Sequence, residues 1–116
     1  GDRLAAARLI VADAADARCI GRVFPLAGER VTLGRYGEWL SVADARWSRR
    51  HAEIAWTPTG FEVTDLGSAN GTRLNGRSLP TEGPQPLLFG SRLTIGSTSF
   101  TFALVHYLAA GAVFRF

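Results

Sequence analysis

Apolar and polar residues alternate over two neighbouring segments in the middle of the chain, residues 51–56 and 61–66. Side chains of a β-strand point alternately to its two faces, so this pattern predicts two strands that each bury one face. Residues 57–60 between them read Thr-Pro-Thr-Gly, which is typical of a turn because proline presets φ and glycine accepts a positive φ. The pattern therefore predicts two strands joined by a turn.

Similar short runs predict further strands at residues 9–12, 22–26, 30–33, 40–42, 72–74, 87–89, 92–95 and 99–105, with a proline-rich loop at 80–86. The runs on either side of Ala27-Gly28-Glu29 predict a hairpin, and Asn75-Gly76 is a strong hairpin-turn signal. The middle of the chain lacks the i, i+3, i+4, i+7 spacing of an amphipathic helix. We therefore expect an all-β fold, a β-sandwich of about eleven short, mostly antiparallel strands.

The length of 116 residues fits a single domain over residues 1–116, with its core at about 9–105 and with flanking segments at 1–8 and 106–116. Hydrophobic residues make up 47% of the chain and charged residues 20%, which is typical of a folded domain. No apolar run approaches the ~20 residues that span a bilayer, and the chain does not start like a signal peptide. We expect a cytoplasmic protein without direct membrane insertion.

The single cysteine, Cys19, excludes an intrachain disulfide and a multi-cysteine metal site. The net charge of +3 is the difference between 13 basic residues, all of them arginine, and 10 acidic residues, and the arginines are scattered along the chain. They concentrate locally at Arg35, Arg46, Arg49 and Arg50, but aromatic residues are not interleaved with them as base-stacking platforms would be. The composition therefore argues against nucleic acid as a partner.

Three polar clusters lie between the predicted strands: Gly34-Arg35, Ser48-Arg49-Arg50-His51-Ala52, and the run from Asp65 to Thr72. A serine three residues before a histidine suggests a nucleophile and a base, but the chain offers no evident third group to orient His51 and no oxyanion hole. We therefore predict no catalytic residues and no enzyme. Groups that hold a phosphate or a peptide backbone, placed in loops of a β scaffold, indicate a recognition site.

In order and spacing, these clusters and Asn75-Gly76 resemble the motifs of a forkhead-associated (FHA) domain, a phosphothreonine-peptide binding module. The resemblance covers about residues 9–105, nearly the whole chain. It implies an eleven-stranded sandwich that binds its ligand with loops at one end, and it implies no cofactor and no metal.

The resemblance assigns the phosphate to Arg35, Ser48 and Arg49, and the peptide backbone to Asn70. The side chains suit these roles: a guanidinium presents a fork of donors, a hydroxyl donates, and an amide both donates and accepts. Each residue also has a plainer interpretation, as a solvated arginine, a turn serine or a loop asparagine.

Five further residues are expected to support the loops. By resemblance His51 is buried and ties the binding loops together through its ring nitrogens. Gly34, Gly71 and Gly76 serve backbone geometry, and Asn75 is a turn former.

The chain departs from the family pattern at two places. Ala69 stands where a threonine or serine often reaches the phosphate, so one hydrogen bond of ~1 kcal/mol would be missing. Glu38-Trp39 replaces a common Asn-Asp pair, and the carboxylate of Glu38 can compete with phosphate for Arg35. For peptide specificity we single out Ala69 together with Arg46, which should favour an acidic residue three positions after the phosphothreonine, and Trp47, which offers an apolar wall instead.

The expected partners are a phosphothreonine-containing protein or peptide and an upstream Ser/Thr kinase. The alternative is an FHA-like scaffolding domain of a bacterial secretion or assembly complex that acts without phosphate. The sequence leaves open which phosphoprotein binds, the oligomeric state, and whether the domain is part of a longer protein.

Overall fold

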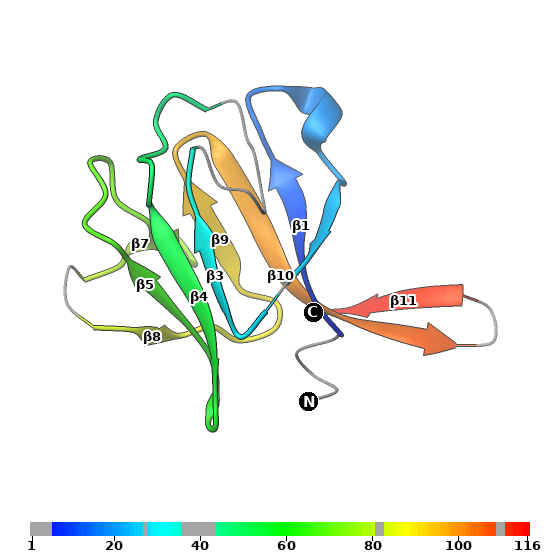
Figure 1. The fold of residues 1–116 in the computed structure, drawn as a ribbon. Coiled ribbons are helices and arrows are strands. Elements are labelled where there is room, and N and C mark those ends of the chain that lie inside the picture. Colours follow the sequence, from blue (N-terminus) through cyan, green and yellow to red (C-terminus); the bar gives the residue numbers. More distant parts are fainter. Residues whose placement is uncertain (1–5, 27, 36–43, 81–82, 109–110) are drawn as a thin grey trace.

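Two antiparallel sheets pack face to face in the computed structural model, which describes residues 6–26, 28–35, 44–80, 83–108 and 111–116 (Figure 1). One sheet has the strand order β2-β1-β10-β9-β6-β7, with β11 paired to β10, and the other has the order β3-β4-β5-β8. The strands of the first sheet are β1 (Ala7–Asp13), β2 (Val23–Pro25), β6 (Arg73–Leu74), β7 (Arg77–Ser78), β9 (Arg92–Ile95), β10 (Thr98–Leu108) and β11 (Gly111–Arg115). Those of the second sheet are β3 (Arg30–Leu33), β4 (Ala52–Thr57), β5 (Gly60–Asp65) and β8 (Gln85–Pro86). The predicted all-β sandwich of eleven strands is confirmed.

The core lies between the two sheets and follows the predicted alternation. Leu9 and Val11 of β1 are buried, as are Ile54 of β4 and Val63 of β5. Their neighbours along each strand are more exposed, because successive side chains point to opposite faces. Each sheet therefore contributes one apolar face to a common core.

Two predicted turns are present. β4 and β5 are joined by residues 57–60, where the hydroxyl of Thr57 donates to the carbonyl of Gly60 over 2.8 Å and Gly60 has φ of 132°. β6 and β7 are joined by Asn75 (φ 52°) and Gly76 (φ 83°), a left-handed pair typical of a tight hairpin. The Asn75 side-chain oxygen also accepts from the main-chain amide of Arg92, which attaches this hairpin to β9.

The predicted hairpin around Ala27-Gly28-Glu29 is wrong. β2 pairs with β1 in one sheet, whereas β3 pairs with β4 in the other. The chain therefore crosses from one sheet to the other between β2 and β3, and buried Leu26 lies at this crossing. Alternation specifies a strand but not its partner, and here both strands find partners distant in sequence.

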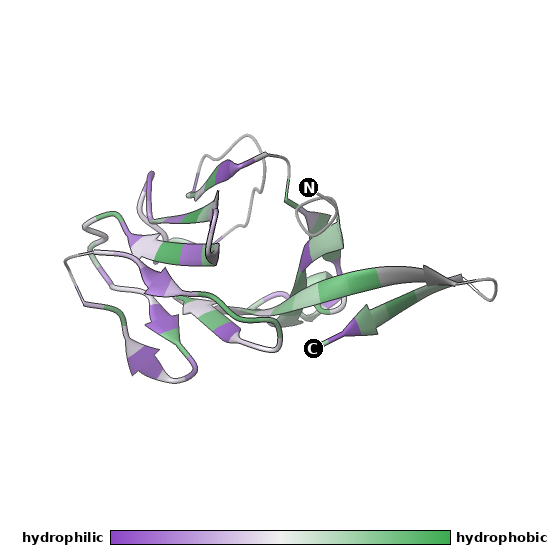
Figure 2. Ribbon diagram, turned by 90° about the horizontal axis from the view of Figure 1, so that it is seen from below, coloured by the Kyte–Doolittle hydropathy of each residue, from purple (hydrophilic) through white to green (hydrophobic). Residues whose placement is uncertain are grey.

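The remaining differences concern strand bounds. The short strand β8 lies at residues 85–86, where a loop was predicted, and residues 87–89 follow it without forming the predicted strand. The strand predicted at residues 40–42 lies outside the described residues. β10 extends to Leu108 and pairs with β11, so the C-terminal flank contains a strand. Figure 2 shows this hairpin projecting from the body of the two sheets.

Within the described residues, no helix has the length and apolar character needed to cross a membrane.

Candidate functional site

Three loops meet at one end of the sandwich, opposite the β4–β5 turn (Figure 1). The first loop (residues 34–35) follows β3, the second (residues 44–51) precedes β4, and the third (residues 66–72) follows β5. The main-chain amide of Arg35 donates to the carbonyl of Ser48 over 3.0 Å, which joins the first loop to the second. The amide of Ala69 donates to the hydroxyl oxygen of Ser48 over 3.0 Å, which joins the third. The structure thus brings the predicted residues Arg35, Ser48 and Ala69 together.

Gly34 is required by the close approach of the first two loops. A Cβ atom at this position would lie 1.8 Å from the carbonyl oxygen of Arg49 and 2.7 Å from its carbonyl carbon. Because these are backbone atoms, no side-chain rotation relieves the clash. Any larger residue would push the loop that carries Arg35 away from the loop that carries Ser48.

His51 lies fully buried between the loops, with 0% of its surface exposed. Its Nδ1 accepts from the main-chain amide of Ser48 over 3.0 Å, and its Nε2 lies 2.7 Å from the carbonyl oxygen of Gly71. Because Nδ1 accepts an amide proton and Nε2 faces a carbonyl oxygen, the neutral tautomer with the proton on Nε2 satisfies both contacts. One side chain thereby fixes the second loop to the third.

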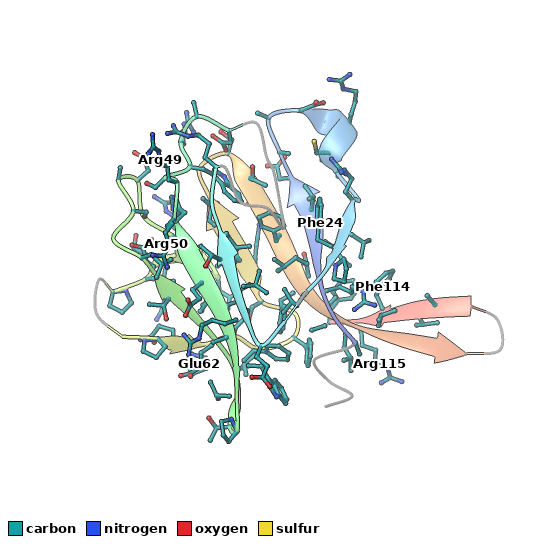
Figure 3. The ribbon with its side chains drawn as sticks, in the orientation of Figure 1. Phe24, Arg49, Arg50, Glu62, Phe114 and Arg115 are labelled. Carbon is teal, nitrogen blue, oxygen red and sulfur yellow. The ribbon has the colours of Figure 1, made fainter. Side chains whose placement is uncertain are left out.

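The hydroxyl of Ser48 is oriented by its neighbours. Its oxygen accepts the proton of the Ala69 amide, so the hydroxyl's own proton is left to donate to a ligand. Ser48 and Arg35 are half-buried, and Arg49 is exposed on the same loop as Ser48 (Figure 3). These three side chains together offer donors suited to an anion.

Asp65, to which the sequence analysis gave no role of its own, organises the third loop. Its carboxylate accepts from the hydroxyls of Ser68 and Thr72, both over 2.6 Å, and from the amides of Gly67 and Ser68. Burial opposes ionisation of this carboxyl, but the hydrogen bonds from Ser68 and Thr72 outweigh it, and the pKa of Asp65 is lowered. An aspartate followed by a polar loop is a known turn signal and could have revealed this role.

Ser68 does not replace the hydroxyl that is missing at position 69. Its Oγ donates to Asp65 and accepts from the amide of Gly71 over 2.9 Å. Both interactions hold the Ser68 side chain inside its own loop. Ala69 itself is exposed, so a larger side chain at that position would point into open space near Ser48.

Asp44 plays the corresponding part in the second loop and was also missed. One carboxylate oxygen accepts from the amide of Arg46 over 3.0 Å, and the other accepts from the amide of Ser97 over 2.7 Å. The second contact anchors the loop to the turn between β9 and β10. Gly96 in that turn is needed because a Cβ there would lie 2.8 Å from both Asp44 and Arg46.

Asn70 is exposed, and its side-chain amide donates to the carbonyl of Arg46 over 2.9 Å. This bond fixes the orientation of the side chain and leaves its carbonyl oxygen to accept a hydrogen bond from a ligand. Arg46 is exposed as well, and its guanidinium donates to the Ser97 hydroxyl over 3.2 Å.

Trp47 is not part of a peptide-binding wall, and that prediction is wrong. Only 1% of its surface is exposed, and its indole N–H donates to the carbonyl of Ile95 over 3.0 Å. Its ring contacts Phe100 edge-on and lies 6.2 Å from the His51 ring. The tryptophan supports the loop from inside the core.

The sequence departs from the family pattern at Glu38 and Trp39 as well as at Ala69, and Glu38 and Trp39 lie outside the described residues.

Comparison with known proteins identifies the fold. The family model of the FHA domain matches residues 31–96. The chain is similar to the structure from a structural and functional analysis of phosphothreonine-dependent FHA domain interactions, with 26% identity and a TM-score of 0.70, over 89% of this chain and 99% of that one. It is also similar to the FHA domain of an Arabidopsis thaliana hypothetical protein, with 26% identity and a TM-score of 0.76, over 91% of each chain.

A third similar structure is Mycobacterium tuberculosis EmbR in complex with a low-affinity phosphopeptide, which is 30% identical with a TM-score of 0.71. That match covers 84% of this chain but 24% of EmbR. No curated protein sequence matches the chain. The chain belongs to the FHA domain family, whose members are binding modules rather than enzymes.

Proposed function

We propose that this FHA domain binds extended peptide segments of partner proteins that carry a phosphothreonine. The observation that carries this proposal is the orientation of Ser48, whose hydroxyl oxygen is occupied by the Ala69 amide so that its proton is available to a ligand. The similar structures include an FHA domain studied for phosphothreonine-dependent interactions and EmbR with a bound phosphopeptide.

In this proposal Arg35, Ser48 and Arg49 bind the phosphate. Their guanidinium and hydroxyl donors match the acceptor oxygens of a phosphate, and hydrogen bonds to an ionised acceptor are stronger than neutral ones. Two main-chain acceptors nearby are already used, because the carbonyl of Ser48 accepts from the Arg35 amide and the carbonyl of Gly71 accepts from His51. The site therefore offers an anion more donors than acceptors.

Asn70 binds the peptide backbone next to the phosphate. Its free carbonyl oxygen accepts from a peptide amide, while its hydrogen bond to Arg46 holds it in place. The partners are then phosphoproteins produced by a Ser/Thr kinase, and the domain acts in the cytoplasm as a single unit spanning residues 1–116. Phosphate-independent scaffolding is the alternative that the experiment below distinguishes.

The test is a titration of the protein with a degenerate phosphothreonine peptide library, followed by calorimetry with a selected peptide. The same peptide with phosphoserine and with unphosphorylated threonine provides the controls. We expect phosphothreonine to bind most tightly, the loss of one methyl to cost ~1–3 kcal/mol, and the unphosphorylated peptide to bind negligibly. Equal binding with and without phosphate would favour the scaffolding role and overturn the proposal.

A further inference from the structure

The strand β11 (Gly111–Arg115) is an exposed edge at the projecting C-terminal hairpin. It pairs with residues 104–108 of β10 in an unbroken register and with no other strand that the structure describes. Val113 is 42% exposed, and Phe116, directly after the strand, is 67% exposed. Figure 2 shows β11 as mostly apolar. A strand edge with unpaired backbone groups and apolar side chains can pair with a strand of another chain.

The edge of β10 that holds β11 is given by the hydrogen bonds of Phe102. The amide of Phe102 donates to the carbonyl of Ser91 over 2.9 Å, and its carbonyl accepts from the amide of Gly90 over 2.7 Å. Both backbone groups of Phe102 therefore point to the edge of β10 where β9 also lies. The end of β11 is on this edge too, because a Cβ atom at Gly90 would lie 3.0 Å from the carbonyl carbon of Phe116.

The register then shows which backbone groups of β11 point outward. Every second residue of a strand points its amide and carbonyl to the same edge, so residues 104, 106 and 108 face β11 as Phe102 faces β9. Their partners in β11 are residues 115, 113 and 111, which face β10 in return. The amides and carbonyls of Ala112 and Phe114 therefore point away from β10. Within the described part of the chain, these groups have no backbone partner.

The other described edges of the two sheets are shorter or better protected. β7 and β8 have two residues each, and β8 contains Pro86. β2 has three residues and contains Pro25, and β3 has four and begins at Arg30, which forms a salt bridge with Glu53. Short strands, prolines and charges are known devices against edge pairing. β11 has five residues, no proline and one charge, so it is the least protected of these edges.

We propose that β11 pairs with β11 of a second copy of this chain, antiparallel and about a two-fold axis at Val113. In this register Ala112 of one copy lies opposite Phe114 of the other, so the outward amides and carbonyls of each pair exchange hydrogen bonds. Arg115 lies opposite Gly111, whereas a parallel pairing in register would bring the two arginines together. The edge is therefore complementary to itself in hydrogen bonding and in charge.

The predicted interface is small. Five paired residues span ~17 Å, and an interface of this kind belongs to the weak, reversible class. An isolated two-stranded hairpin has little stability of its own, and the pairing joins two such hairpins into one four-stranded sheet. The hairpin and the three loops lie apart in Figure 1, so the loop end stays open in each copy. The dimer presents two recognition sites at once.

Sedimentation equilibrium of the 116-residue chain over a wide concentration range tests the proposal. We expect a reversible monomer–dimer equilibrium with a dissociation constant on the order of 10–100 µM. Val113→Lys places two like charges opposite each other at the axis and should weaken the dimer about tenfold. Ser78→Lys is the matched control, because it adds the same charge at an exposed position of another edge strand, β7. It should dimerise like the wild type.

A second variant removes a single outward donor. Ala112→Pro deletes an amide that β10 does not use, so it should weaken the dimer and leave thermal unfolding of the monomer unchanged. Ala112→Val keeps the amide and should dimerise normally. In the wild type, the amides of Ala112 and Phe114 should gain protection from hydrogen exchange as the protein concentration rises. The amide of Val113 faces β10 and should change little.

Three results would overturn the proposal. A chain that stays monomeric at every concentration excludes the dimer, and if it then binds vesicles of neutral phosphatidylcholine, the hairpin belongs at a lipid surface. A dimer that survives both Val113→Lys and Ala112→Pro, or that Ser78→Lys weakens equally, does not form through β11. Assemblies that grow beyond the dimer would contradict a closed two-fold pairing.

Discussion

The two ends of the sandwich are built from different interactions. At the loop end, buried polar residues hold the chain: His51 and Asp44 form hydrogen bonds that join segments distant in sequence, and Asp65 accepts hydrogen bonds from Ser68 and Thr72 within its own loop. At the end with the β4–β5 turn, aromatic rings pack together. Phe61 lies with its ring centroid 4.7 Å from that of Trp56 and 4.9 Å from that of Phe102.

The end with the β4–β5 turn is held mainly by packing of aromatic side chains. The rings of Phe89 and Phe102 are stacked with their centroids 4.8 Å apart, and a groove lined by Trp56 and Leu88, among others, lies beside them. Burial of such rings stabilises the fold but leaves no oriented donors. At the loop end, by contrast, hydrogen bonds fix the directions of the Ser48 and Asn70 side chains, and such fixed directions are what a binding site requires.

The comparison predicts that Phe61→Ala affects stability and not recognition. Removing a buried phenylalanine typically costs ~3–5 kcal/mol of unfolding free energy. Denaturant unfolding should show this loss, while calorimetry on the folded protein should give an unchanged affinity for phosphopeptide. A large drop in affinity in folded Phe61→Ala would mean that the two ends are not independent.

Arg35→Ala should have the opposite profile. Losing one partner of a hydrogen-bonded charge pair costs ~2–5 kcal/mol of binding free energy. Stability should change little, because the hydrogen bond from Arg35 to Ser48 uses the main-chain amide. Arg50→Ala, at an exposed position in the neighbouring loop, is the control and should bind almost normally.

His51→Ala should damage both properties. It leaves the Ser48 amide and the Gly71 carbonyl without their partner, and an unsatisfied buried group costs ~1–3 kcal/mol. We expect a lower melting temperature and weaker phosphopeptide binding, measured by thermal unfolding and calorimetry. A variant with wild-type stability that loses only binding would instead indicate a direct contact between His51 and the ligand.

Ala69→Thr should produce the smallest change and in the favourable direction. The new hydroxyl would lie beside Ser48 and add a hydrogen bond of ~1 kcal/mol to the phosphate, about a fivefold gain in affinity. Ala69→Val, which matches the shape without the hydroxyl, should give no gain. If both substitutions act alike, the third loop does not bring position 69 to the phosphate.

Local patterns predicted the strands better than their partners. β4 and β5 begin one residue away from their predicted starts, at 52 against 51 and at 60 against 61, because strict alternation and the turn at 57–60 mark them. The wrong hairpin around Gly28 had an equally good local pattern. The two strands pair elsewhere, β2 with β1 and β3 with β4, because the partner of a strand depends on the packing of the whole core.

For the site, the sequence indicated candidate side chains but not how each of them is held in the folded chain. The order of Arg35, Ser48 and Asn70 along the chain follows the family pattern. The indole N–H of buried Trp47 donates a hydrogen bond to the carbonyl of Ile95, 48 residues away. The carboxylate of Asp44 accepts one from the amide of Ser97, 53 residues away. Contacts of this kind appear only once the chain is folded.

The most direct test of the account is a map of amide chemical-shift changes during titration of the labelled protein with a phosphothreonine peptide. The account predicts that the changes concentrate at the amides of Arg35, Ser48, Ala69 and Asn70, and that the unphosphorylated peptide produces none. Changes centred on Trp56 and Leu88 at the opposite end, or identical changes with both peptides, would contradict it.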